Sequence, residues 1–111
     1  MKYLLLICTE GPFDPADHTP EELDAQPWVD ELNRRGVHLT GDRVRPAGDA
    51  TTVRVRAGET LVTDGPFAET KEQMGGFDII ECADLDEAIE IAARHPMAKL
   101  GMVEVRPFWP M

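Results

Sequence analysis

The stretch KYLLLICT, from Lys2 to Thr9, decides the fold of this chain. The side chains of a strand alternate between two faces, and both faces are apolar here: Tyr3, Leu5 and Ile7 on one, Leu4, Leu6 and Cys8 on the other. A continuous apolar run of this kind indicates a strand that is covered on both sides. It is too short to span a membrane, and no small-residue cleavage site follows it. We therefore predict the first strand of a cytoplasmic protein.

A first helix is predicted to begin after Thr19, which can form a capping box with Glu22, and to end before Gly36. Pro27 interrupts the pattern. A proline inside a helix removes a hydrogen bond and clashes with the preceding turn, at a cost of about 3 kcal/mol. We therefore expect either a kink near Gln26 or two short helices, with Pro27 starting the second.

A second helix is predicted after the N-cap Asp84, and the pair His95-Pro96 ends it. A positive charge on His95 would favour the dipole at this helix end. The spacing of the apolar residues predicts which face is buried. That face carries Leu85, Ala88, Ile89 and Ala92.

The remaining strands are predicted at residues 37–44, 52–57, 60–63, 77–82 and 102–106. The segments 52–57 and 60–63 flank Gly58 and Glu59, and they predict a hairpin with one solvent-exposed face. The element order is β-α-β, an inserted hairpin, then β-α-β. That order is typical of the split βαβ, or ferredoxin-like, plan in the α+β class. The length of 111 residues suits a single domain, residues 1–111.

The second apolar face of the first strand predicts a dimer. Both helices of a ferredoxin-like plan lie on the same face of the sheet, and the sequence predicts no third helix for the other face. A second copy of the chain is the simplest cover, with two sheets packed face to face by isologous pairing. The expected assembly is a homodimer.

Charge and histidine spacing exclude several classes of function. Eleven basic and twenty-one acidic residues give a formal charge of −10, which disfavours direct binding to nucleic acid or to anionic membranes. The spacing of His18, His38 and His95 matches no metal-ligand motif. No phosphate-binding loop or redox CxxC is present, so we expect no cofactor and no metal.

The loop DGPFAETKE, residues 64–72, concentrates the unusual chemistry of the chain. Asp64 is a candidate general acid/base, although an aspartate before Gly-Pro also bonds its own turn. Glu69 and Lys71 are candidate ligand-binding residues, or else a solvated ion-pair cluster. Phe67 can pack in the core or face a ligand. His38, on the predicted strand 37–44, could reach the same cleft.

Several stretches resemble the DGPF branch of the YCII-related family. They are residues 1–7, 51–55, 63–72 with the following Gly75-Gly76-Phe77, 84–88 and 103–107. The resemblance implies a bacterial, cytoplasmic protein without a known cofactor, which forms a dimeric α/β barrel. It also implies that extracytoplasmic-function sigma factors accompany similar domains. A histidine and an aspartate are candidate catalytic residues in the wider family, but Gln26-Pro27-Trp28 stands where its first-helix histidine would lie.

Three hypotheses for function follow. The first is a small-molecule-binding protein or cofactor-independent enzyme that uses Asp64 for proton transfer. The second is a non-enzymatic accessory or regulatory protein, for example a sigma-factor partner. The third is an architectural loop that pins the dimer through Phe67.

Overall fold

A computed structural model describes residues 1–11, 13–65 and 72–110 of the chain. The body is a four-stranded sheet in the order β2-β5-β1-β6, in which every pair is antiparallel. The strands are β1 Lys2–Glu10, β2 His38–Arg43, β5 Glu72–Glu81 and β6 Met102–Pro107. This α+β arrangement is compatible with the ferredoxin-like plan predicted from the element order.

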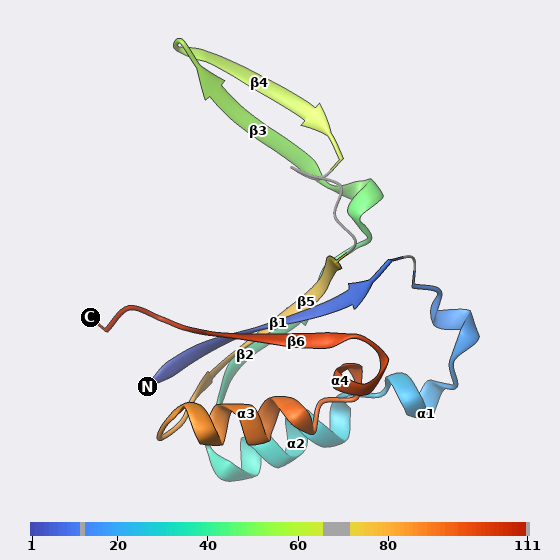
Figure 1. Ribbon diagram of the computed structural model, residues 1–111, viewed down its shortest axis with the longest axis vertical. Coiled ribbons are helices and arrows are strands. Elements are labelled where there is room, and N and C mark those ends of the chain that lie inside the picture. The colour runs from blue at the N-terminus through green and yellow to red at the C-terminus, as the bar shows by residue number, and fades with distance from the viewer. Residues whose placement is uncertain (12, 66–71, 111) are drawn as a thin grey trace.

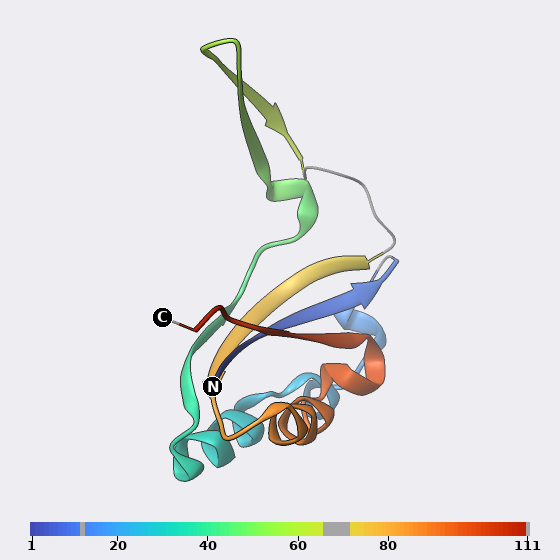
Figure 2. The same ribbon diagram turned by 60° about the vertical axis from the view of Figure 1, so that its left-hand side comes forward.

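The helices lie together on one face of this sheet, as Figures 1 and 2 show. The longer ones are α2, Gln26–Arg35, and α3, Leu85–Ala93. The shorter ones are α1 Pro20–Leu23, α4 Met97–Leu100 and the 3-10 turn η1 Pro15–Asp17. A second 3-10 turn, η2 Ala47–Asp49, follows β2 and lies apart from these helices (Figure 1). The sequence patterns did not predict α4, because its four residues are too few to show a period.

The break between α1 and α2 confirms the expected effect of Pro27. The capping box at Thr19 and Glu22 is formed, and α1 ends at Leu23. The second helix then begins at Gln26, with Pro27 in its first turn, where a missing N–H costs nothing. It ends at Gly36, which adopts the left-handed conformation with φ 71°.

The buried face of α3 differs from the predicted one. The cap by Asp84 is confirmed, since its side chain accepts from the backbone N–H of Glu87. However, Leu85 and Ile89 are 49% and 51% exposed, whereas Ile91 is fully buried beside Ala88 and Ala92. The helix has two neighbouring apolar stripes, and its packing against the sheet and α2 selects the one that contains Ile91.

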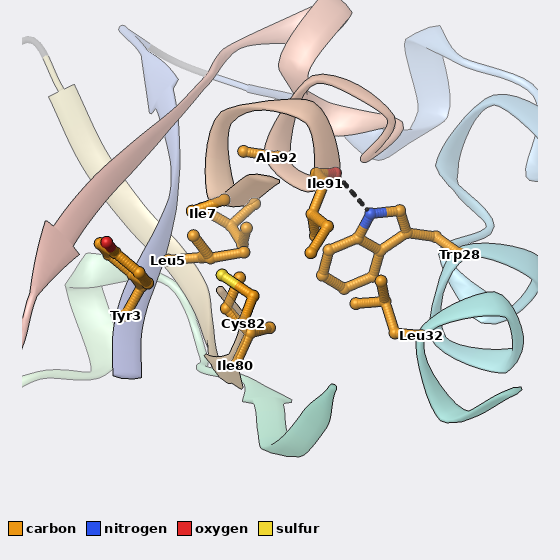
Figure 3. Packing of buried hydrophobic residues seen from close by; sticks show 10 residues of the cluster. Tyr3, Leu5, Ile7, Trp28, Leu32, Ile80, Cys82, Ile91 and Ala92 are labelled. Atoms are coloured by element: carbon orange, nitrogen blue, oxygen red, sulfur yellow. Dashed lines mark hydrogen bonds between the residues drawn. The ribbon is translucent and has the colours of Figure 1, made fainter. Parts of the chain in front are cut away.

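The core lies between the sheet and the helices (Figure 3). The inner face of β1 and the end of β5 supply one side of it, and α2 and α3 supply the other. The buried apolar residues are Tyr3, Leu5, Ile7, Trp28, Leu32, Ile80, Cys82, Ala88, Ile91 and Ala92. The indole Nε1–H of Trp28 donates to the carbonyl oxygen of Ile91 at 2.9 Å, so one hydrogen bond joins the two long helices.

The predicted hairpin is present, but its exposure is not as expected. Strands β3 Thr51–Arg56 and β4 Glu59–Asp64 form a separate two-stranded sheet that projects away from the body (Figure 1). Its apolar side chains Val53, Val55 and Val62 are 60%, 59% and 64% exposed. The hairpin was predicted to expose one face only, and this was wrong, because these strands pair with each other and not with the main sheet.

The outer face of β1 carries the half-buried residues Leu4, Leu6 and Cys8, opposite the helices. The alternation along β1 thus agrees with the sequence, with the fully buried set facing the helices. Covering of the outer face by a second copy stays a prediction.

Candidate functional site

An open cavity of about 960 Å³ lies at the end of the sheet where α1 and α2 begin. Its walls come from η1, α1, the first turns of α2, the end of β2 and the beginning of β5. Apolar side chains make up much of the described lining: Ile7, Phe13, Leu23, Trp28, Val29, Phe77 and Met97. A mostly apolar cavity of this volume is typical of sites for small organic molecules.

A carboxylate and an imidazole meet beside this cavity. His38 Nε2 lies 2.9 Å from Oδ1 of Asp78, and each side chain is only 12% exposed. The two residues come from the neighbouring strands β2 and β5, whose register shifts between His38 and Thr40. A shift of this kind changes the direction in which side chains point. Asp78 belongs to the cavity lining, and His38 supports it from the sheet.

Burial is the main influence on the Asp78 carboxylate. It raises the pKa of Asp78 above the usual value, because removal from water disfavours the charged form. The hydrogen bond and charge of His38 lower this pKa in part. With Asp78 ionised, His38 Nε2–H is the donor, since a carboxylate only accepts. The pair therefore presents a carboxylate that is more basic than an ordinary aspartate.

Gly41 makes room for this carboxylate. It lies opposite Asp78 in the β2–β5 register. A Cβ at position 41 would overlap the Asp78 side chain and approach the carbonyl oxygen of Phe77 at 2.8 Å. Only glycine leaves space here for a carboxylate that bonds His38.

We expect Gly41→Ala to destabilise the fold by about 2–3 kcal/mol, because overpacking forces backbone and side chains apart. The matched control is Gly48→Ala, since a Cβ at Gly48 meets nothing within 4 Å. Urea unfolding of both variants measures the difference. Equal stability of the two variants would contradict the crowding at Asp78.

Two aromatic contacts place a second imidazole next to the pair. The Trp28 ring makes an edge contact with His38, with centroids 6.3 Å apart, and another with His95, with centroids 4.7 Å apart. His95 is 6% exposed and also lines the cavity. Its Nδ1 accepts from the backbone N–H of Met97 at 3.0 Å. Trp28 therefore contacts both histidines, and Trp28 and His95 themselves line the cavity.

His95 stands just after α3, as predicted, but it is not positioned as a charged residue. Burial lowers its pKa from 6.5 to about 4. The ring is therefore neutral near pH 7. It places no positive charge at the end of α3, so the predicted stabilisation of the helix dipole does not apply at this pH. Since Nδ1 accepts a hydrogen bond from Met97, the single proton of the neutral ring lies on Nε2.

This lowered pKa makes stability depend on pH. The unfolded chain protonates His95 as the pH falls through about 6.5, whereas the folded chain resists protonation until about pH 4. Folding stability should thus fall as the pH decreases from about 6.5 to about 4, by on the order of 2 kcal/mol after screening. The raised pKa of Asp78 acts in the opposite direction.

The stability difference between the wild type and His95→Asn isolates the histidine contribution, because Asp78 is common to both proteins. We expect this difference to shrink as the pH falls from 6.5 to 4, in chemical unfolding followed by circular dichroism. A difference that stays constant over this range would contradict a buried neutral His95.

Comparison with known proteins identifies the family. The whole chain, residues 1–111, matches the YCII-related domain. The chain belongs to the YCII-related family. An uncharacterised protein of Rhizobium meliloti (strain 1021) is 54% identical over 67 residues, which are 59% of this chain and 54% of that protein. The chain thus spans about half the length of this curated relative.

The family predicted from the sequence is therefore confirmed, and its DGPF branch stays a prediction. In this YCII-related chain, the two predicted site residues that the structure describes, Asp64 and His38, lie on different sheets. Asp64 is exposed at the end of β4, opposite Thr51 in the hairpin, and is not among the described lining residues of the cavity. His38 is beside the cavity, bonded to Asp78. The other three candidates, Phe67, Glu69 and Lys71, lie outside the described residues.

The sequence analysis did not select Asp78, although one signal was available. Asp78 interrupts an otherwise apolar strand segment between Phe77 and Ile79. An acidic residue in such a segment is rarely buried without a partner. An aspartate in an apolar strand segment is therefore a candidate site residue even when its partner is not evident from the sequence.

Among residues 1–11, 13–65 and 72–110, no cluster of three or more His, Cys, Asp or Glu side chains is arranged to hold a metal ion. No helix in the same part of the YCII-related chain is long and apolar enough to cross a membrane. Asp78 and His95 are the buried ionisable residues of the described cavity lining, which also contains the charged residues Glu21, Asp24, Asp42, Arg43 and Arg45.

Proposed function

We propose that this cytoplasmic YCII-related protein binds a small organic molecule in the cavity and transfers a proton on it without a cofactor. Asp78 is the acid/base in this proposal. The observation that carries it is the buried Asp78 carboxylate, which lines the cavity and is held by His38. Perturbed carboxylates inside clefts are frequent at functional sites.

The geometry of the pair supports a proton-transfer role. His38 binds Oδ1, and no group in the described part of the chain donates a hydrogen bond to Oδ2. That second oxygen is free to contact a ligand. General acid–base catalysis favours a group whose pKa is closer to the working pH than that of a free aspartate, and burial moves Asp78 in this direction.

The first test is a thermal-shift screen of the wild type with small metabolites. A ligand that binds only the folded state raises the melting temperature, by an amount that grows with concentration. We expect hits whose shift decreases in Asp78→Asn, because the carboxylate contacts the ligand. A screen in which every hit binds the variant as tightly as the wild type would remove Asp78 from the site.

The role predicted for Asp64 stays a prediction. Its exposed position supports a separate proposal, in which it acts with the neighbouring loop residues Glu69 and Lys71 on a ligand at the hairpin. Asp64→Asn tests it: loss of ligand binding with an intact fold would support this second site. Unchanged binding and activity would leave Asp64 with the turn role alone.

We also propose that the protein is a homodimer with the barrel arrangement that its family resemblance implies. The half-buried Leu4, Leu6 and Cys8 on the outer sheet face support this proposal, because pairing would cover them. Light scattering should give about twice the chain mass for the wild type. Leu6→Glu should give a monomer, since a charge at such an interface is desolvated without a partner. A monomeric wild type at micromolar concentration would contradict the dimer.

The alternative is a non-enzymatic accessory protein that binds an extracytoplasmic-function sigma factor. One observation favours a protein partner: the exposed apolar face of the hairpin, with Val53, Val55 and Val62. Exposed apolar surface often marks an interaction site. Co-elution with a co-encoded sigma factor, lost in Val53→Asp, would support this function. Absence of a complex at micromolar concentration would oppose it.

A further inference from the structure

We propose that the molecule bound in the cavity is a carbonyl compound with an acidic C–H next to the carbonyl group. In this assignment His95 Nε2–H donates to the carbonyl oxygen and Asp78 removes the neighbouring proton. The inference rests on the proposed function, because it keeps Asp78 as the base. It adds the chemical class of the substrate and a second residue that contacts it.

The His95 ring is fixed in place by three contacts. Its backbone lies in the turn between α3 and α4, where its N–H bonds the carbonyl oxygen of Ala92 at 3.1 Å. Its Nδ1 is held by the N–H of Met97. The His95 ring makes a T-shaped contact with the ring of Trp28, and the indole N–H of Trp28 donates to the carbonyl oxygen of Ile91. A ring held in this way is preorganised, so its Nε2–H needs little rearrangement when a ligand binds.

The protonation state of His95 selects a hydrogen-bond donor. The neutral ring carries its proton on Nε2, because Nδ1 already accepts from Met97. An imidazolium could not accept the hydrogen bond of the Met97 N–H at Nδ1, because both of its ring nitrogens carry protons. A neutral imidazole instead polarises a carbonyl and stabilises negative charge that develops on its oxygen. The cavity lining thus contains both a base and a neutral donor.

These two groups match the needs of proton removal next to a carbonyl. An alkane-like ligand would leave both polar groups unpaired, which costs binding energy. A carbonyl oxygen satisfies His95, and the adjacent C–H places the acidic proton toward the base. The apolar lining of Phe13, Leu23 and Met97 suits the remaining carbon skeleton.

The step balances without any co-reactant. The C–H bond breaks and its proton moves to the free oxygen of Asp78. The C–H electron pair forms a C=C bond, and the carbonyl π pair moves onto oxygen, which keeps the hydrogen bond from His95. Return of a proton from Asp78 to carbon completes an isomerisation or an exchange with solvent.

Phenylpyruvate is a suitable probe, because it joins an aromatic body to a carbonyl group with acidic C–H bonds. In D2O, proton NMR measures deuterium incorporation at its C3 above the buffer rate. We expect exchange by the wild type and a loss of about 100-fold in His95→Asn, the usual effect of one removed donor to a developing oxyanion. The matched ligand 3-phenylpropionate lacks the ketone. It should bind the wild type about tenfold more weakly than phenylpyruvate does, whereas His95→Asn should bind the two ligands equally.

Two variants separate the donor from the structural role of His95. The amide of His95→Asn can still accept from Met97 but cannot place a donor where Nε2 was. The longer side chain of His95→Gln can place its amide N–H there but gives up the acceptor for Met97. We expect Gln to retain exchange within about tenfold of the wild type, despite a lower melting temperature. The opposite order, with Asn active and Gln inactive, would overturn the donor role.

The outcomes distinguish this inference from the proposed function. Exchange that disappears in Asp78→Asn but stays at the wild-type rate in both His95 variants would overturn the role of His95 and keep Asp78 as the base. A wild type that neither exchanges nor preferentially binds phenylpyruvate would overturn the carbonyl class. In that case, screen hits that still need Asp78 would keep the proposed function.

Discussion

We expect Asp78→Asn to reduce proton transfer by about 10²- to 10⁴-fold, the usual contribution of a positioned acid or base. Asparagine has nearly the same shape, and its amide oxygen can still accept from His38 Nε2–H. The variant should therefore lose the base without losing the contact. Deuterium exchange into phenylpyruvate measures the rate, and substrate titration separates kcat from KM, with a small rise expected in KM and most of the loss in kcat.

The melting temperature of Asp78→Asn shows whether its lower rate comes from loss of the base or from unfolding of the protein. Burial raises the pKa of Asp78, so the charged form is costly in the folded state. The neutral asparagine avoids that cost, and the melting temperature of the variant should equal or exceed that of the wild type at pH 7. Asp86→Asn is the matched control, since it changes an exposed aspartate of α3 in the same way. Equal rates in Asp78→Asn and the wild type would contradict the assignment of the base.

We expect Trp28→Ala to destabilise the protein by about 3–5 kcal/mol, the range for removal of a large buried aromatic side chain. Trp28 is 7% exposed and joins the core to both histidines. The variant also loses the hydrogen bond to the Ile91 carbonyl, which would then be buried without its donor. Urea unfolding at pH 7 measures the change in the free energy of unfolding.

Trp109→Ala is the control for this variant, because Trp109 is 89% exposed in the C-terminal tail. Its stability should change by less than about 0.5 kcal/mol. Trp28→Phe keeps most of the ring but lacks the indole donor, so an intermediate loss of about 1–3 kcal/mol is expected. A loss below about 1 kcal/mol for Trp28→Ala would show that Trp28 does not link the helices to the core.

Local signals made several elements of the fold predictable. The cap at Thr19, the break at Pro27 and the stop at Gly36 each depend on a few adjacent residues and on backbone chemistry. The free hairpin and the buried face of α3 were mispredicted for the opposite reason. Whether Val53 or Ile89 is buried depends on which other elements pack nearby, and no window of sequence contains that information.

The candidate site was harder to predict than the fold. His38 and Asp78 are forty residues apart, and they meet only through the β2–β5 register and its shift. The neutral state of His95 likewise depends on burial by distant parts of the chain. The sequence analysis selected the acidic loop by its density of ionisable groups, whereas the proposed site in the cavity rests on a few ionisable groups that are buried.

The most direct test of the cavity as the binding site uses the two tryptophans as internal probes. In a nitrogen-15 NMR spectrum, the indole N–H signals of Trp28 and Trp109 are separate reporters of the cavity wall and the exposed tail. Titration with phenylpyruvate should shift the Trp28 indole signal and the amide signal of Gly41, and leave the Trp109 indole unchanged. Shifts confined to the hairpin of β3 and β4, with the Trp28 indole unmoved at saturation, would contradict a ligand site at Asp78 and His95.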